Sequence, residues 1–109
     1  MSYEIVAIPN FRGELKKLAK KYPSLKEDFS ELIQSLQDNP TQGVSLGKNC
    51  YKIRMAISSK GKGKSGGSRV ISLVKITQIT IFLLSIFDKS EKENISDNEL
   101  KTLISLIDE

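Results

Sequence analysis

The chain has 109 residues, enough for one domain with a modest core, and we treat residues 1–109 as a single domain. Its hydrophobic and charged fractions, 39% and 28%, are ordinary for a soluble protein, and its net charge is +4. The absence of histidine removes the commonest general base and, with a single cysteine (Cys50), excludes a Cys/His metal cluster and an internal disulfide. We therefore expect a cytoplasmic protein without metal, cofactor or membrane span.

The first 40 residues predict a strand followed by two helices. Residues 3–8 alternate as a short strand that ends at Pro9, and Asn10 is placed to cap a helix whose apolar face includes Phe11 and Leu18. Ser24 and Glu27 have the spacing of a capping box that begins a second helix, which closes at residues 38–40. The short connection predicts that the two helices pair as a hairpin.

The remainder predicts three strands and a terminal helix. Residues 51–57 alternate between apolar and polar side chains, whereas residues 70–74 and 79–87 are apolar β-rich runs joined by a turn near 75–78. Ser96 and Glu99 form a second capping-box signature before a short amphipathic helix. The predicted fold is therefore α+β, in the order β-α-α-β-β-β-α, with a small antiparallel sheet and an N-terminal helical hairpin.

Charge is segregated along the chain. Between Asp38 and Asp88 there is no acidic residue, yet this window holds eight of the 17 basic residues. Its centre is the glycine-rich run at 60–69, in which lysine alternates with glycine. Glycines let a polyanion's backbone approach closely, and we expect that nothing nearby neutralises the lysines. This pattern indicates a polyanionic partner.

The glycine-rich run also resembles nucleotide-binding motifs, and each of these alternatives needs a following helix. Gly61, Gly63 and Gly66 match a dinucleotide fingerprint, and residues 63–65 match the end of a Walker A motif, but a strand follows in both cases. The remaining alternative is a solvated hairpin tip. Because Lys52, Arg54 and Arg69 lie on the two flanking strands and are expected to face one surface, we favour a basic patch that binds nucleic acid.

At these residues the chain resembles the RelE/ParE superfamily of type II toxins, in its HigB-like and RelE-like branch. The likeness rests on the run at 52–54, on the run at 61–71 and on residues 83–91 with the terminal helix that follows. It implies a fold similar to microbial ribonucleases and a toxin that a cognate antitoxin holds inactive. It further implies a ribosome-dependent mRNA endonuclease whose partners are the ribosome and mRNA, with DNA contacted only through the antitoxin complex.

A ribonuclease of this kind uses the 2′-hydroxyl of its substrate as nucleophile, and needs a base, an acid and cations around the phosphate. From the resemblance, Lys52 is the candidate base, Arg54 and Arg69 are candidate transition-state clamps, and Lys89 is a further candidate catalytic residue. The candidate RNA-binding residues share a positive charge near this patch; they are Lys48, Lys60, Lys62, Lys64 and Lys92.

Two departures from the family pattern leave other functions open. Many relatives carry tyrosine where this chain has Ser72 and Phe87, so that a phenolic acid is not evident. The alternatives are a ParE-like inhibitor of gyrase and a nucleic-acid-binding relative without catalysis.

Overall fold

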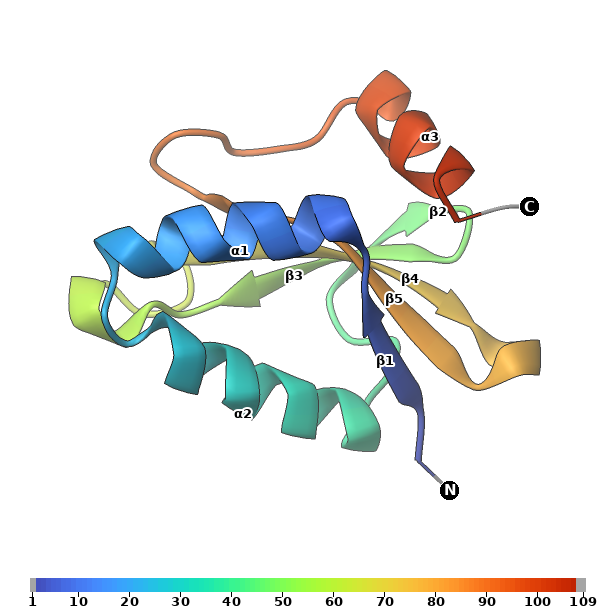
Figure 1. Cartoon of the computed structure of the whole chain (residues 1–109), viewed down its shortest axis with the longest axis horizontal. Coiled ribbons are helices and arrows are strands. Elements are labelled where there is room, and N and C mark those ends of the chain that lie inside the picture. The colour runs from blue at the N-terminus through green and yellow to red at the C-terminus, as the bar shows by residue number, and fades with distance from the viewer. Residues whose placement is uncertain (1, 108–109) are drawn as a thin grey trace.

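The computed structural model describes residues 2–107 and consists of a five-stranded sheet with three α-helices (Figure 1). Along the chain these elements are β1 (Glu4–Ala7), α1 (Pro9–Lys21), α2 (Leu25–Asp38), β2 (Val44–Gly47), β3 (Cys50–Met55), β4 (Ser68–Lys75), β5 (Thr80–Asp88) and α3 (Asp97–Ser105). Two short 3₁₀ turns, η1 (Ser58–Lys60) and η2 (Ile76–Gln78), follow β3 and β4.

The sheet has the strand order β1-β5-β4-β3-β2, with β1 parallel to β5 and every other pair antiparallel. The predicted α+β class and the helical hairpin are confirmed. The predicted sheet was incomplete in two respects: it lacked β2, and it took the first strand as antiparallel. A strand of four residues that ends in a tight turn is too short to show an alternating pattern, which is why β2 escaped prediction.

The two N-terminal helices form where their apolar periodicity predicted, but they begin differently. Helix α1 starts at Pro9 with Ile8 at its N-cap, and α2 starts after Ser24 without a side-chain cap. The capping roles predicted for Asn10 and Ser24 are therefore wrong. Proline has a backbone angle suited to the first turn and lacks the N–H that would need a cap, so α1 begins one residue before Asn10. Phe11 and Phe29 bring the helices together, with ring centroids 5.5 Å apart.

Helix α1 covers the part of β5 that β1 is too short to pair. The Asn10 amide donates a hydrogen bond to the Leu84 carbonyl oxygen (2.9 Å), and the Glu14 carboxylate accepts from the Ser85 hydroxyl (2.8 Å) and the Ile86 N–H (3.3 Å). Polar side chains of a helix thus satisfy an open strand edge. Asn10 therefore binds the unpaired edge of β5, in place of the capping role that was predicted for it.

The C-terminal segment covers the other side of the sheet. Figure 1 shows α2 on one side and α3 on the other, with a long connection from β5 to α3. The capping box predicted at Ser96 and Glu99 is confirmed, since each side chain accepts a hydrogen bond of 3.1 Å from the backbone N–H of the other residue. None of the helices within residues 2–107 is long and apolar enough to cross a membrane.

Candidate functional site

The sheet brings predicted basic residues of two neighbouring strands onto one face. Arg54 of β3 lies directly opposite Arg69 of β4, which in turn lies opposite Phe87 of β5. Lys52 lies two residues from Arg54 and therefore shares its face. The prediction that Lys52, Arg54 and Arg69 share a surface is confirmed.

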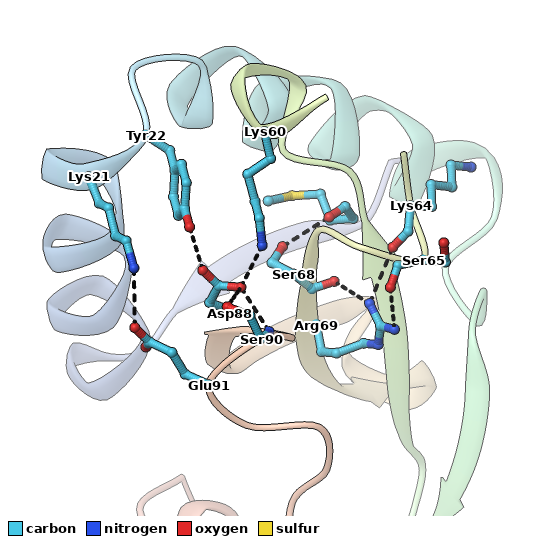
Figure 2. A network of polar contacts seen from close by, with 11 residues as sticks. Lys21, Tyr22, Lys60, Lys64, Ser65, Ser68, Arg69, Asp88, Ser90 and Glu91 are labelled. Atoms are coloured by element: carbon cyan, nitrogen blue, oxygen red, sulfur yellow. Dashed lines mark hydrogen bonds and ion pairs between the residues drawn. The ribbon is translucent and has the colours of Figure 1, made fainter. Parts of the chain in front are cut away.

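Arg69 is almost fully buried, with 5% of its surface exposed. Its guanidinium donates hydrogen bonds to the carbonyl oxygens of Lys64 (3.2 Å), Ser65 (3.1 Å) and Ser68 (3.1 Å), as Figure 2 shows. Burial lowers the pKa of Arg69 from its ordinary value, as does the charge of Arg54. We expected Arg69 to clamp a phosphate, whereas the structure directs these N–H groups at the backbone of the glycine-rich loop.

Lys60 is half-buried, with 10% of its side chain exposed, and its ammonium lies 2.8 Å from an oxygen of Asp88. The expectation that nothing nearby neutralises the lysines is therefore wrong for this residue. Asp88 is the first acidic residue after the basic window, and the antiparallel pairing of β4 with β5 returns it to the base of the loop. This ion pair commits the charge of Lys60 to Asp88, and the role of Lys60 in RNA binding stays a prediction.

Asp88 is the centre of a polar network that joins several elements (Figure 2). Besides the Lys60 ammonium, its carboxylate accepts hydrogen bonds from the Tyr22 hydroxyl (2.6 Å) and from the Ser90 N–H (3.0 Å) and hydroxyl (2.9 Å). Burial acts to raise the pKa of Asp88, but the hydrogen bonds from Lys60, Tyr22 and Ser90 outweigh it and hold the pKa well below its usual range. The carboxylate is therefore ionised at neutral pH although only 1% of the residue is exposed.

The loop at 61–67 is folded closely on itself. Gly61 and Gly63 have positive φ values of 70° and 67°, which an L side chain rarely adopts. A Cβ atom on Gly66 would lie 2.6 Å from the Cβ atom of Lys62, so these two residues touch. Lys62 and Lys64 are exposed. Two cations of the loop therefore face solvent.

Lys48 does not join this cluster. It lies in the turn between β2 and β3, with a positive φ of 56°, whereas the glycine-rich loop follows the opposite end of β3. The two ends of that six-residue strand are about 17–20 Å apart, at the usual rise per residue. The structure thus separates Lys48 from the other predicted RNA-binding residues.

The segment between β5 and α3 forms one wall of a cleft of about 480 Å³, opposite the glycine-rich loop. Lys89 lies 3.8 Å from Glu93, and Lys92 pairs with Glu99 at 2.5 Å. The residues that line the cleft are mostly charged or polar; they are Lys60, Lys62, Gly66, Lys89, Ser90, Glu91, Lys92 and Glu93. Lys89 and Lys92 are therefore brought beside the loop, as predicted, but each has an acidic neighbour.

Glu93 is a carboxylate that the sequence reasoning missed. The patch was described from its cations alone, because no acidic residue lies between Asp38 and Asp88, yet Glu93 lies close to Lys89 and acts to raise the pKa of Arg69 against the effect of burial. Its position beyond the acid-free window, in a segment without regular structure, gave no sequence signal that it would reach this face. Within residues 2–107, no group of three or more Cys, Asp or Glu side chains is placed to hold a metal ion.

The two positions that lack the family's tyrosine differ in location. Ser72 is paired with Tyr51 and lies on the face opposite to Lys52, where it is fully buried. Phe87 lies on the basic face, and the Lys92 ammonium is 5.1 Å from its ring centroid. Lys52 donates a hydrogen bond of 3.4 Å to Asn94 on the same side. Only the Phe87 position therefore bears on the chemistry of the basic face.

Comparison with known proteins assigns the chain to a family. A model described as the RelE toxin of the RelE/RelB toxin–antitoxin system matches residues 12–108. The solved structure of a double arginine-to-alanine mutant of E. coli toxin RelE in the free state is similar over 98% of this chain and 99% of its own, with 17% identity and a TM-score of 0.66.

Two further structures share the fold. The isolated E. coli RelE toxin matches 97% of this chain and 100% of its own, with 18% identity and a TM-score of 0.52. The intact E. coli RelBE toxin–antitoxin complex matches 80% of this chain and 96% of its own, with 20% identity and a TM-score of 0.51. Because the family model spans most of the sequence, the chain belongs to the RelE family of type II toxins.

Proposed function

We propose that this toxin is a ribosome-dependent mRNA endonuclease that stops translation. The observation that carries the proposal is the basic face, on which Lys52 and Arg54 lie beside Arg69 in neighbouring strands. A cluster of cations on a sheet suits a substrate with a charged backbone, and the exposed Lys62 and Lys64 extend it at one end.

In the proposed reaction the 2′-oxygen of a nucleotide attacks its own 3′-phosphorus, and the bond from phosphorus to the 5′-oxygen breaks. The products are a 2′,3′-cyclic phosphate and a 5′-hydroxyl. A base removes the 2′-proton and an acid returns a proton to the leaving oxygen. Because the substrate supplies the nucleophile, this chemistry does not need a metal-bound water.

Lys52 is the proposed base, and Arg54 is the proposed cation for the phosphate oxygens. Arg54 is exposed, unlike Arg69, so its guanidinium is free to meet a substrate. Lys89 is the proposed acid because it borders the cleft beside the loop. Glu93 is a second candidate base, since it is the carboxylate that lies beside Lys89 and acts on Arg69.

Primer extension on a translated mRNA, after induction of the toxin, tests the reaction and its base. We expect cuts at codon-related sites with the wild-type chain, and a loss of about 10²–10³-fold in rate with Lys52→Met or Arg54→Ala. Lys16→Met, on the exposed side of α1, is the matched control and leaves cleavage unchanged. If Glu93→Gln abolishes cleavage while Lys52→Met retains it, then Glu93 is the base. Intact mRNA in wild-type cells refutes the proposal.

The same experiment addresses the alternatives. Intact mRNA together with DNA damage signalling would indicate a ParE-like inhibitor of gyrase, and growth inhibition with neither result would indicate binding without catalysis. We further propose a cognate antitoxin as partner, because the fold matches that of the E. coli RelBE complex. In this proposal the toxin acts on cytoplasmic ribosomes and meets DNA only through the antitoxin complex.

A further inference from the structure

We propose that Asp88 is a positioning residue, which holds the glycine-rich loop against the segment that follows β5 so that Lys62 contacts a phosphate of single-stranded RNA. The inference rests on the proposed function for its ligand, and it assigns a purpose to a buried charge that does not itself touch substrate. Its basis is the geometry around the cleft between the loop and the segment at 89–93.

The two walls of this cleft come from separate parts of the chain, and Asp88 is bound to both. The Lys60 ammonium fixes η1, which begins the loop, to one carboxylate oxygen at 2.8 Å. Ser90 fixes the opposite wall to the same oxygen through its N–H and its hydroxyl, at 3.0 and 2.9 Å. One oxygen atom therefore sets the spacing between the walls.

The neighbouring contacts make this spacing specific. The Tyr22 hydroxyl donates a hydrogen bond of 2.6 Å to the second carboxylate oxygen of Asp88, and the Tyr22 ring centroid lies 5.6 Å from the Lys60 ammonium. The Lys89 N–H donates to the Gly67 carbonyl oxygen at 3.0 Å, which ties the far end of the loop to the same wall. Arg69 separately holds the carbonyl oxygens of Lys64 and Ser65, so the stretch at 61–63, with its flexible Gly61 and Gly63, is the part of the loop that can move once the Lys60 contact is lost.

Lys62 is the loop cation that benefits from this arrangement. It is exposed, it lines the cleft, and among residues 2–107 no acidic side chain lies within ion-pair distance of its ammonium. By contrast, Lys89 and Lys92 on the other wall each have an acidic neighbour. A phosphate that enters the cleft therefore meets a positive charge without an acidic neighbour at Lys62, provided that the loop is held in place.

Binding of a short fluorescein-labelled 2′-O-methyl RNA, measured over a range of salt concentrations, tests the inference without relying on cleavage. Asp88→Asn removes a negative charge, so electrostatics alone predicts tighter binding, whereas loss of positioning predicts weaker binding. We expect several-fold weaker binding. Lys62→Ala in the wild-type background should make the salt slope less negative by about 0.7, the value of one phosphate on a single strand.

The double variant distinguishes positioning from independent effects. We expect Lys62→Ala to change neither the affinity nor the salt slope once Asp88→Asn is present, because the misplaced lysine no longer contacts the phosphate. Tyr22→Phe is the matched control: it removes one hydrogen bond to Asp88 but keeps the ion pair, so it lowers the melting temperature and leaves the full effect of Lys62→Ala. If Asp88→Asn does not fold, Lys60→Gln replaces it in the double-variant comparison alone, because loss of a cation that lines the cleft weakens binding by itself.

Tighter or unchanged binding by Asp88→Asn, or an undiminished effect of Lys62→Ala in the double variant, overturns the inference. A wild-type chain that does not bind the RNA overturns it as well. If the expected coupling is found but translated mRNA remains intact with the wild-type toxin, the positioning role stands and the proposed endonuclease activity fails.

Discussion

Replacement of Arg69 by methionine is expected to destabilise the protein strongly, although arginine is usually a surface residue. The change keeps the aliphatic stem and removes the guanidinium, which makes three hydrogen bonds to backbone carbonyl oxygens. A hydrogen bond from a charged donor contributes about 1.5–3 kcal/mol. The three bonds are not additive, because one buried cation makes them all, close to the repulsive charge of Arg54. We therefore expect the free energy of unfolding to fall by about 2–3 kcal/mol.

Urea denaturation followed by circular dichroism measures this change. Arg54→Met is the matched control, since Arg54 is exposed and occupies the adjacent strand position. We expect the control to leave the unfolding midpoint nearly unchanged, or to raise it slightly by relieving the repulsion. Equal midpoints for the two variants would refute the view that Arg69 anchors the glycine-rich loop.

Further predictions concern other buried groups and two glycines. Because folding lowers the pKa of Asp88, its ionised form stabilises the protein above the unfolded-state pKa of about 3.9, and this stability is lost as the pH falls below that value; Asp88→Asn should show a shallower acid transition in urea melts at each pH. The buried hydroxyl of Ser72 has no hydrogen-bond partner within residues 2–107, so Ser72→Ala should raise the free energy of unfolding by about 1 kcal/mol in the same assay. Burial raises the pKa of Cys50 to about 11, so a maleimide should modify it at pH 8 only after unfolding, as mass spectrometry would show. Gly67→Ala should lower the melting temperature, because its Cβ atom would lie 2.4 Å from a backbone carbonyl oxygen of β3, whereas Gly13→Ala, with open space around it in α1, should raise it. A thermal shift of the same sign for both glycine variants would contradict this reasoning.

Much of the fold could be predicted because its signals are local. The apolar faces of α1 and α2 follow a helical period, and β3 alternates so clearly that its buried residues, such as Ile53 and Met55, were identified correctly. The capping box at Ser96 was also correct. At Ser24 the same pattern was misleading, since its hydroxyl instead donates to Asp28 (2.8 Å), which also accepts hydrogen bonds from Ser58. A capping signature does not show whether a tertiary contact competes for the same side chain.

The sequence predicted which basic residues gather at the candidate site. It did not predict which of them face solvent and which make internal contacts. Lys52 and Arg54 lie two residues apart in β3, so their shared face was expected from the alternation of side chains along one strand. The pairing of Lys60 with Asp88 joins residues 28 positions apart and depends on β5 ending beside the start of the loop. Glu93 was overlooked for a similar reason, because it reaches the basic face through a segment without regular structure.

The segregation of charge along the sequence therefore has two physical consequences. Two cations of the acid-free window are turned inward: Arg69 is buried and binds loop carbonyls, and the largely covered side chain of Lys60 binds Asp88. Their charges therefore build the loop. Lys62 and Lys64 remain exposed on that loop. A buried cation without a partner is strongly unfavourable, so the single carboxylate at Asp88 is what allows a lysine to serve as an internal support. Asp88 pairs with Lys60, whereas Lys62 and Lys64 are exposed. The charges of these two lysines are therefore available to a partner.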